Sequence, residues 1–204
     1  MKGLLMKDYY TLLKQMKLYL VFIAILSLMQ NMSLSGLAVV YAAMLPITAL
    51  AYDERSKWDS LAATMPYSSA DVVLSKYVLG YLGIAVSCVL TFVIELGIAA
   101  YRQASFTLEQ GIAILLIGCV GAFLLAIISP FMFWLGVERG RIVYFVLIAV
   151  TVFLGMMAGS QVHSLIAQAN LSSVAIVAWA FAATAFLSAA SIWGSIAIYR
   201  RKPR

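Results

Sequence analysis

The sequence predicts an all-α protein that crosses a membrane six times. Of its 204 residues, 64% are hydrophobic and only 11% are charged, whereas soluble domains carry roughly 25% charged residues. Several apolar runs also reach the roughly 20 residues that cross a hydrocarbon core of about 30 Å. Backbone groups in lipid must be paired internally, and strands this apolar and this few could not close a barrel. Each run is therefore expected to be a helix of a polytopic membrane protein.

Hydropathy and helix breakers place six spans within a single transmembrane domain, residues 1–204. The fourth span contains Pro130, whose ring is expected to kink or end the helix there. The spans cover about Lys17–Met29, Leu34–Tyr52, Lys76–Tyr101, Gln110–Leu135, Arg141–Gly159 and Ser172–Tyr199.

The basic residues predict the orientation of these spans, because Lys and Arg near span ends are retained on the cytoplasmic side. With the N-terminus inside, every Lys and Arg except Arg102 falls on the cytoplasmic face. Both termini are therefore predicted to be cytoplasmic. This topology accounts for the net charge of +6, so no nucleic-acid partner is needed to explain it.

The first 16 residues predict an amphipathic helix that lies in the membrane interface. Its apolar side chains fall on one stripe of a helix, and its charged residues, Lys7 and Asp8 among them, largely face away. Apolar burial and attraction to anionic lipid would hold such a helix at the inner leaflet. A plain cytoplasmic extension of the first span is the alternative. The stripe consists of Leu4, Leu5, Tyr9, Leu12, Leu13 and Met16.

The longest segment outside the spans is the cytoplasmic loop 53–75, which predicts two helical pieces. Asp53 can cap a first helix, whose apolar residues lie at the spacing i, i+3, i+4 and i+7 until Pro66 ends it. Ser68 and Asp71 have the spacing of a capping box, so a second helix should start at Ser68 or Ser69 and run into the third span. The apolar residues of the first piece are Trp58, Leu61, Ala62 and Met65.

This loop is longer than a connection between antiparallel helices requires, which is about two to eight residues. Asp53, Glu54 and Asp59 disfavour contact with an anionic leaflet, and Trp58 amid charges of both signs suits a protein contact. We therefore predict that a soluble protein partner docks on the loop. A helix resting on lipid is the alternative.

The sequence contains no catalytic constellation and no G-x-x-x-x-G-K-[ST] phosphate loop, so the chain is predicted to have no enzyme activity and no nucleotide site of its own. One histidine and two separated cysteines predict no metal site. Glu95 is the one acidic residue inside a predicted span. It either contacts the substrate pathway or only fixes packing. Gly155 and Gly159 form a small-xxx-small pattern that permits close helix packing.

Three stretches of the chain resemble the small six-span permease subunits of ABC-2 type exporters from Gram-positive bacteria. They are MKGLLMKDYY at the N-terminus, YDERSKWDSLAATMPYSSADVVLSKY between the second and third spans, and GVERGR between the fourth and fifth. The sequence is also similar to the permeases that export phenol-soluble modulin peptides. The middle stretch is the most specific of the three.

The resemblance implies a transporter of the bacterial plasma membrane, built from two permeases and two separate ABC ATPase subunits that bind ATP and Mg²⁺. The second permease could be an identical copy or a related chain. The cargo would be an amphipathic peptide toxin, antimicrobial peptide or drug. The first cytoplasmic loop would carry a coupling helix that docks on the ATPase. Carried over by position, its contacts are Asp53, Glu54, Lys57, Trp58 and Asp59, to which the apolar stripe adds Leu61.

Two other functions remain open from the sequence. An ion-coupled secondary transporter would show internal repeats and acidic residues near the membrane midplane, whereas this chain offers one off-centre acid, Glu95. A membrane immunity protein without transport activity is the other alternative. Binding of an ATPase subunit would distinguish the exporter from both.

Overall fold

The computed structural model describes residues 3–12, 17, 21, 25, 41–65, 67–103, 105, 107–168 and 173–201. All regular secondary structure in these residues is helical, as the sequence predicts. Residues 3–12 form a helix that we call the N-terminal segment. The helices that follow are α3 (Leu45–Arg55), α4 (Trp58–Thr64), α5 (Ser69–Tyr101), α6 (Leu108–Leu135), α7 (Val137–Gln168) and α8 (Ser173–Arg201).

Three helices are long and apolar enough to cross a membrane: Ser69–Tyr101, Leu108–Leu135 and Ala175–Arg201. They match the predicted third, fourth and sixth spans. The fifth predicted span lies within α7, and α3 covers only the last part of the second. The first predicted span falls almost wholly outside the described residues, so the count of six stays a prediction.

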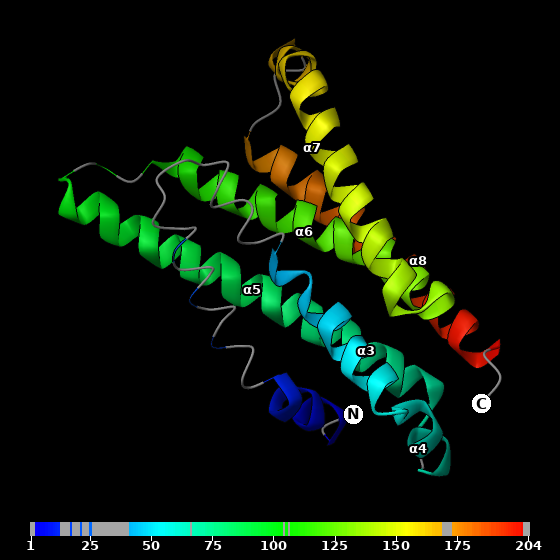
Figure 1. The fold of residues 1–204 in the computed structure, drawn as a ribbon. Helices are drawn as coiled ribbons and strands as arrows, with labels where there is room; N and C mark the ends of the chain where they lie inside the picture. The colour runs from blue at the N-terminus through cyan, green and yellow to red at the C-terminus, as the bar shows by residue number, and fades with distance from the viewer. Residues whose placement is uncertain are drawn as a thin grey trace.

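Helix α6 lies at the centre of the bundle and packs against α5, α7 and α8. Figure 1 shows α5 and α6 side by side, with α3 lying along the first part of α5 and α7 rising away from the end of α6. Helix α3 also contacts α4 and α7. The most apolar window of α8 is only 6% buried within this chain, so lipid or another subunit must cover this helix.

The start of α5 follows the predicted capping box. Ser68 is the N-cap, its hydroxyl accepts a hydrogen bond from the backbone N–H of Asp71, and the Asp71 carboxylate accepts one from the backbone N–H of Ser68. These bonds pair two backbone donors that a helix N-terminus otherwise leaves free. The chain therefore passes from the loop into a helix of 33 residues without an intervening break.

Pro130 does not end its helix, because α6 continues to Leu135. A proline has no N–H for the carbonyl four residues earlier, which is that of Ala126. Ser191 of α8 donates a hydrogen bond to this carbonyl instead. The Ser191 hydroxyl also lies 2.6 Å from the hydroxyl of Tyr77 on α5. A polar contact between three helices thus replaces the bond that the proline removes.

Candidate functional site

An apolar cluster joins the N-terminal segment to the first turns of α5 and to the last turns of α6 and α8. Trp58 of α4 and Tyr67 pack against its edge. With Leu50 of α3, six elements meet at the end of the bundle that carries α4, as Figure 1 shows for the blue N-terminal segment and α4. The buried members of the cluster are Leu4, Val72, Val73, Tyr77, Phe133 and Tyr199.

Four charged side chains form a closed ring beside this cluster: Lys7 and Asp8 of the N-terminal segment, Asp53 of α3 and Lys76 of α5. The Lys76 amine lies 2.7 Å from Asp8 Oδ1 and 2.6 Å from Asp53 Oδ2. The Lys7 amine lies 2.5 Å from Asp53 Oδ1 and 3.1 Å from Asp8 Oδ1. Each lysine thus contacts both carboxylates, and the ring carries no net charge.

Three members of the ring are buried, whereas the side chain of Lys7 is 23% exposed. Asp8 is 1% exposed, Lys76 3% and Asp53 8%. Moving a single ion from water into a protein interior costs on the order of several kcal/mol, and only close opposite charges offset this cost. Departure of α3 or α5 would leave the remaining buried charges unbalanced, and departure of the N-terminal segment would break its two ion pairs with Asp53 and Lys76. The ring therefore fixes the N-terminal segment, α3 and α5 to one another.

Trp58 connects α4 to this ring. The Lys7 amine lies 4.2 Å from the centre of its indole ring, which is a favourable cation–π distance. Ala62, one helical turn later, is buried as well. Trp58 and Ala62 therefore form the face by which α4 packs onto the rest of the protein.

The other two residues of the predicted apolar stripe point outward. Leu61 is 50% exposed, and Met65, the residue after the helix, is 39% exposed. The single stripe predicted from the sequence is thus divided between two faces, because Trp58 and Ala62 lie one turn apart on one side and Leu61 and Met65 on another. An apolar pair on the outer face of α4 remains available to a partner.

Asp53 does not cap α4, contrary to the sequence prediction. Helix α3 continues through it to Arg55, and its carboxylate is held by Lys7 and Lys76. The chain turns at Ser56 and Lys57, and Lys57 is the N-cap of α4 with a left-handed backbone (φ 51°). A contact between Asp53 and a partner would require the ring to open.

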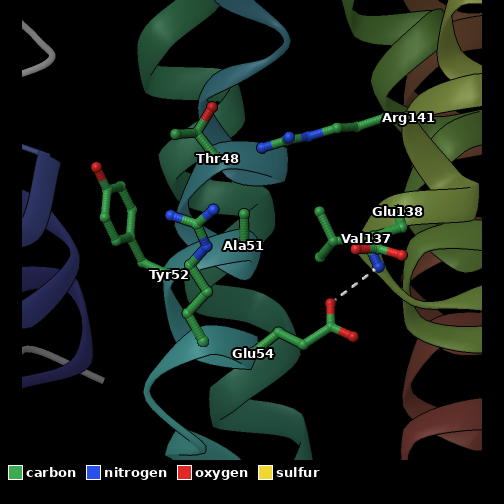
Figure 2. A pocket seen from close by; sticks show the side chains of 8 residues that line it. Thr48, Ala51, Tyr52, Glu54, Val137, Glu138 and Arg141 are labelled. Carbon is green, nitrogen blue, oxygen red and sulfur yellow. Dashed lines mark hydrogen bonds between the residues drawn. The ribbon is translucent and has the colours of Figure 1, made fainter.

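Glu54 is exposed but has an internal bond. Its Oε2 accepts a hydrogen bond of 3.1 Å from the backbone N–H of Val137, the first residue of α7. Figure 2 shows this bond across the gap between α3 and α7. A carboxylate at this position pairs a free N–H and complements the positive end of the helix dipole. Gly136 precedes this residue with φ +80°, and a Cβ there would lie 3.4 Å from Glu54 Oε1.

The remaining predicted residues lie apart from this site or beyond the described side chains. The side chain of Asp59 is not among those described, although its backbone belongs to α4. Glu95 is half-buried in α5 and forms no ion pair with a described residue. Gly155 and Gly159 lie in α7, where their surroundings are outside the described residues. Their predicted roles stay predictions.

The sequence predicts Lys7 and Asp8 on the polar side of the N-terminal segment, and it predicts for Lys76 only a cytoplasmic position at the start of the third span. The structure instead buries Asp8 on the same face as Leu4 and Leu12, whereas Tyr9 of the predicted stripe is 50% exposed. Asp8 follows Leu4 and precedes Leu12 by four residues each, so one charge lies on an otherwise apolar face. A buried carboxylate at such a position needs a cation from another element. The spacing of Asp8 between Leu4 and Leu12 was therefore the one sequence feature that could have predicted the ion pair.

A comparison with protein families agrees with this architecture over nearly the whole chain. The family model described as ABC-2 family transporter protein matches residues 3–200. The chain belongs to the ABC-2 transporter family. No curated protein and no solved structure matches it at a significant level.

Membership of the ABC-2 family identifies the chain as a multi-pass membrane permease, a transport subunit of a kind that typically pairs with an ABC ATPase. The matched region contains the charge ring, α4 and the α3–α7 contact. Contact of Asp53, Glu54, Lys57, Trp58, Asp59 and Leu61 with an ATPase stays a prediction.

Proposed function

We propose that this ABC-2 permease exports an amphipathic substrate and receives its driving force through α4, which docks on a separate ATPase subunit. The observation that carries the proposal is the division of α4 into two faces. Leu61 and Met65 are exposed on one face, while Trp58 and Ala62 attach the other to the protein. A short helix with this arrangement can bind a partner and pass a displacement inward.

The charge ring provides the route by which the displacement travels. Trp58 contacts Lys7, and Lys7 binds Asp53 at the end of α3. Asp53 in turn binds Lys76 on α5, one of the candidate spans. Closure of an ATPase dimer that moves α4 would therefore move the N-terminal segment, α3 and α5 together.

Within this proposal, the ATPase subunits bind ATP and Mg²⁺, and a second permease, identical or related, completes the pathway. The basic residues favour a cytoplasmic position for α4 and both termini, in the plasma membrane of a bacterium. The resemblance to peptide-exporting permeases supports a peptide toxin or antimicrobial peptide as cargo, with amphipathic drugs as the other class. Glu95 would act along the pathway only if that pathway follows α5.

Replacing Leu61 with aspartate is expected to weaken binding of the ATPase strongly. A charge at the centre of an apolar contact must be desolvated without a partner, and truncation of such central residues commonly costs about 2 kcal/mol or more, which is a loss of affinity of roughly thirtyfold. The measurement is co-purification of a co-expressed ABC ATPase subunit from the same organism, together with the rate of ATP hydrolysis by the complex.

Leu108→Asp is the matched control, since Leu108 is also an exposed leucine in the first turn of a helix and is 85% exposed. It should leave both readouts unchanged. If wild-type permease binds no ATPase, the exporter hypothesis fails and the ion-coupled transporter or immunity protein replaces it. If Leu61→Asp still binds and stimulates the ATPase normally, the role of α4 is wrong.

A further inference from the structure

A pocket of about 440 Å³ lies between α3 and the first turn of α7, apart from the charge ring. Its volume falls within the range typical of small-molecule sites, roughly 300–1,000 Å³. Figure 2 shows the side chains that line it. Its polar lining residues are Thr48, Tyr52, Glu54, Arg55, Glu138 and Arg141.

The two arginines of this pocket have no carboxylate partner among the described residues. Neither Arg55 nor Arg141 forms an ion pair with any residue in the part of the chain that the structure describes. Figure 2 shows Arg141 reaching from α7 toward Thr48 on α3. Two guanidinium groups that line one cavity suit a phosphate group, because each can donate two parallel hydrogen bonds to its oxygens.

The acidic residues lie nearer the end of α3. Glu54 is bonded to Val137, and Glu138 follows Val137 in the first turn of α7 (Figure 2). Thr48 precedes Glu54 by six residues, which is about 9 Å along a helix. With the predicted topology, in which α3 ends on the cytoplasmic side, Arg141 lies nearer the membrane than the two glutamates, while Arg55 follows Glu54 in the last turn of α3.

A cation nearer the membrane and carboxylates further out match a phospholipid whose phosphate lies deeper than a positively charged head group. At the level where α3 leaves the bilayer, the phosphate of a phospholipid lies closer to the hydrocarbon than the outer part of its head group does. Glutamates at the outer rim would repel the head group of an anionic phospholipid. They would attract the ammonium group of an aminophospholipid. A free phosphate ion would contact the same arginines, but it has no cationic group for the glutamates to bind.

We propose that the pocket binds the head group of an aminophospholipid from the leaflet on the α4 side, with the phosphate at Arg55 and Arg141 and the ammonium at Glu138. Such a lipid would bridge α3 and α7 beside the bond from Glu54 to Val137. The site is independent of the proposed coupling role of α4.

The test is native mass spectrometry of the purified permease after exchange into mixed micelles of phosphatidylethanolamine and phosphatidylglycerol. Wild-type protein should retain phosphatidylethanolamine in preference to phosphatidylglycerol. The double variant Arg55→Gln/Arg141→Gln should bind it at least about tenfold more weakly, because two charge-assisted contacts are lost. Arg139→Gln changes an exposed arginine of the same helical turn that does not line the pocket, and should behave as wild type.

Two further variants test the roles of the arginines and of Glu138. Arg55→Lys/Arg141→Lys keeps both charges and should retain more lipid than the glutamine pair, which separates binding from misfolding. Glu138→Gln should reduce the preference for phosphatidylethanolamine. Equal retention by wild type and the glutamine pair would overturn the proposal. Displacement of the lipid by millimolar inorganic phosphate would overturn it too, because it would identify a site for a soluble anion.

Discussion

Lys76→Met is expected to destabilise the protein by about 3–5 kcal/mol, the range observed when one partner of a buried ion pair is removed. Lys76 is 3% exposed, and its amine lies 2.7 Å from Asp8 Oδ1 and 2.6 Å from Asp53 Oδ2. Its loss leaves two buried carboxylates with Lys7 alone. Thermal or denaturant unfolding of the purified protein in detergent measures the change.

A second variant separates the charge effect from the loss of a long side chain. Asp8→Leu combined with Lys76→Met leaves one cation, Lys7, and one anion, Asp53, which are 2.5 Å apart. Because the remaining pair is neutral, the double variant should be more stable than the sum of the two single changes predicts, by about 1–3 kcal/mol. Strict additivity would mean that the ring contributes no coupling, and the proposed route of displacement would lose its basis.

Trp58→Ala is expected to detach α4 from the bundle. The indole packs against the apolar cluster and lies under the Lys7 amine, and truncation of a large buried aromatic typically costs about 3–5 kcal/mol. Because Trp58 is only partly buried, the loss should fall near the lower end of that range. We expect faster proteolysis within residues 56–68 and weaker stimulation of ATP hydrolysis.

Trp58→Phe is the matched control for this prediction. The indole nitrogen forms no hydrogen bond with a described residue, so phenylalanine removes ring area and weakens the cation–π contact without removing such a bond. It should keep most of the ATPase stimulation. If alanine and phenylalanine reduced stimulation equally, packing of this ring would not be what attaches α4.

The elements that the sequence predicts best are those set by local chemistry. The capping box at Ser68 depends on two side chains three residues apart, and the apolar runs of α5, α6 and α8 depend on composition alone. These interactions lie within one turn or one helix. The residues that cause these elements to form therefore lie close together in the sequence, where they can be recognised without a structure.

The charge ring could not be predicted in this way, because its members come from the N-terminal segment, α3 and α5, with Lys76 and Asp8 separated by 68 positions along the chain. Tertiary contacts also explain the errors. Asp53 does not cap α4 because Lys7 and Lys76 hold its carboxylate, and Asp8 lies on the apolar side of the N-terminal segment because Lys76 pairs with it. The position and outward face of α4 follow from the ring, and so they too needed the structure.

The most direct test of the coupling proposal is photo-crosslinking from the outer face of α4. A benzophenone amino acid replaces Leu61 in one variant and Leu108 in another, and membranes from cells that also express the ATPase are irradiated. The account predicts a covalent permease–ATPase product from position 61 that depends on light and is absent from position 108. An ATPase product from position 108 but none from position 61 would contradict it.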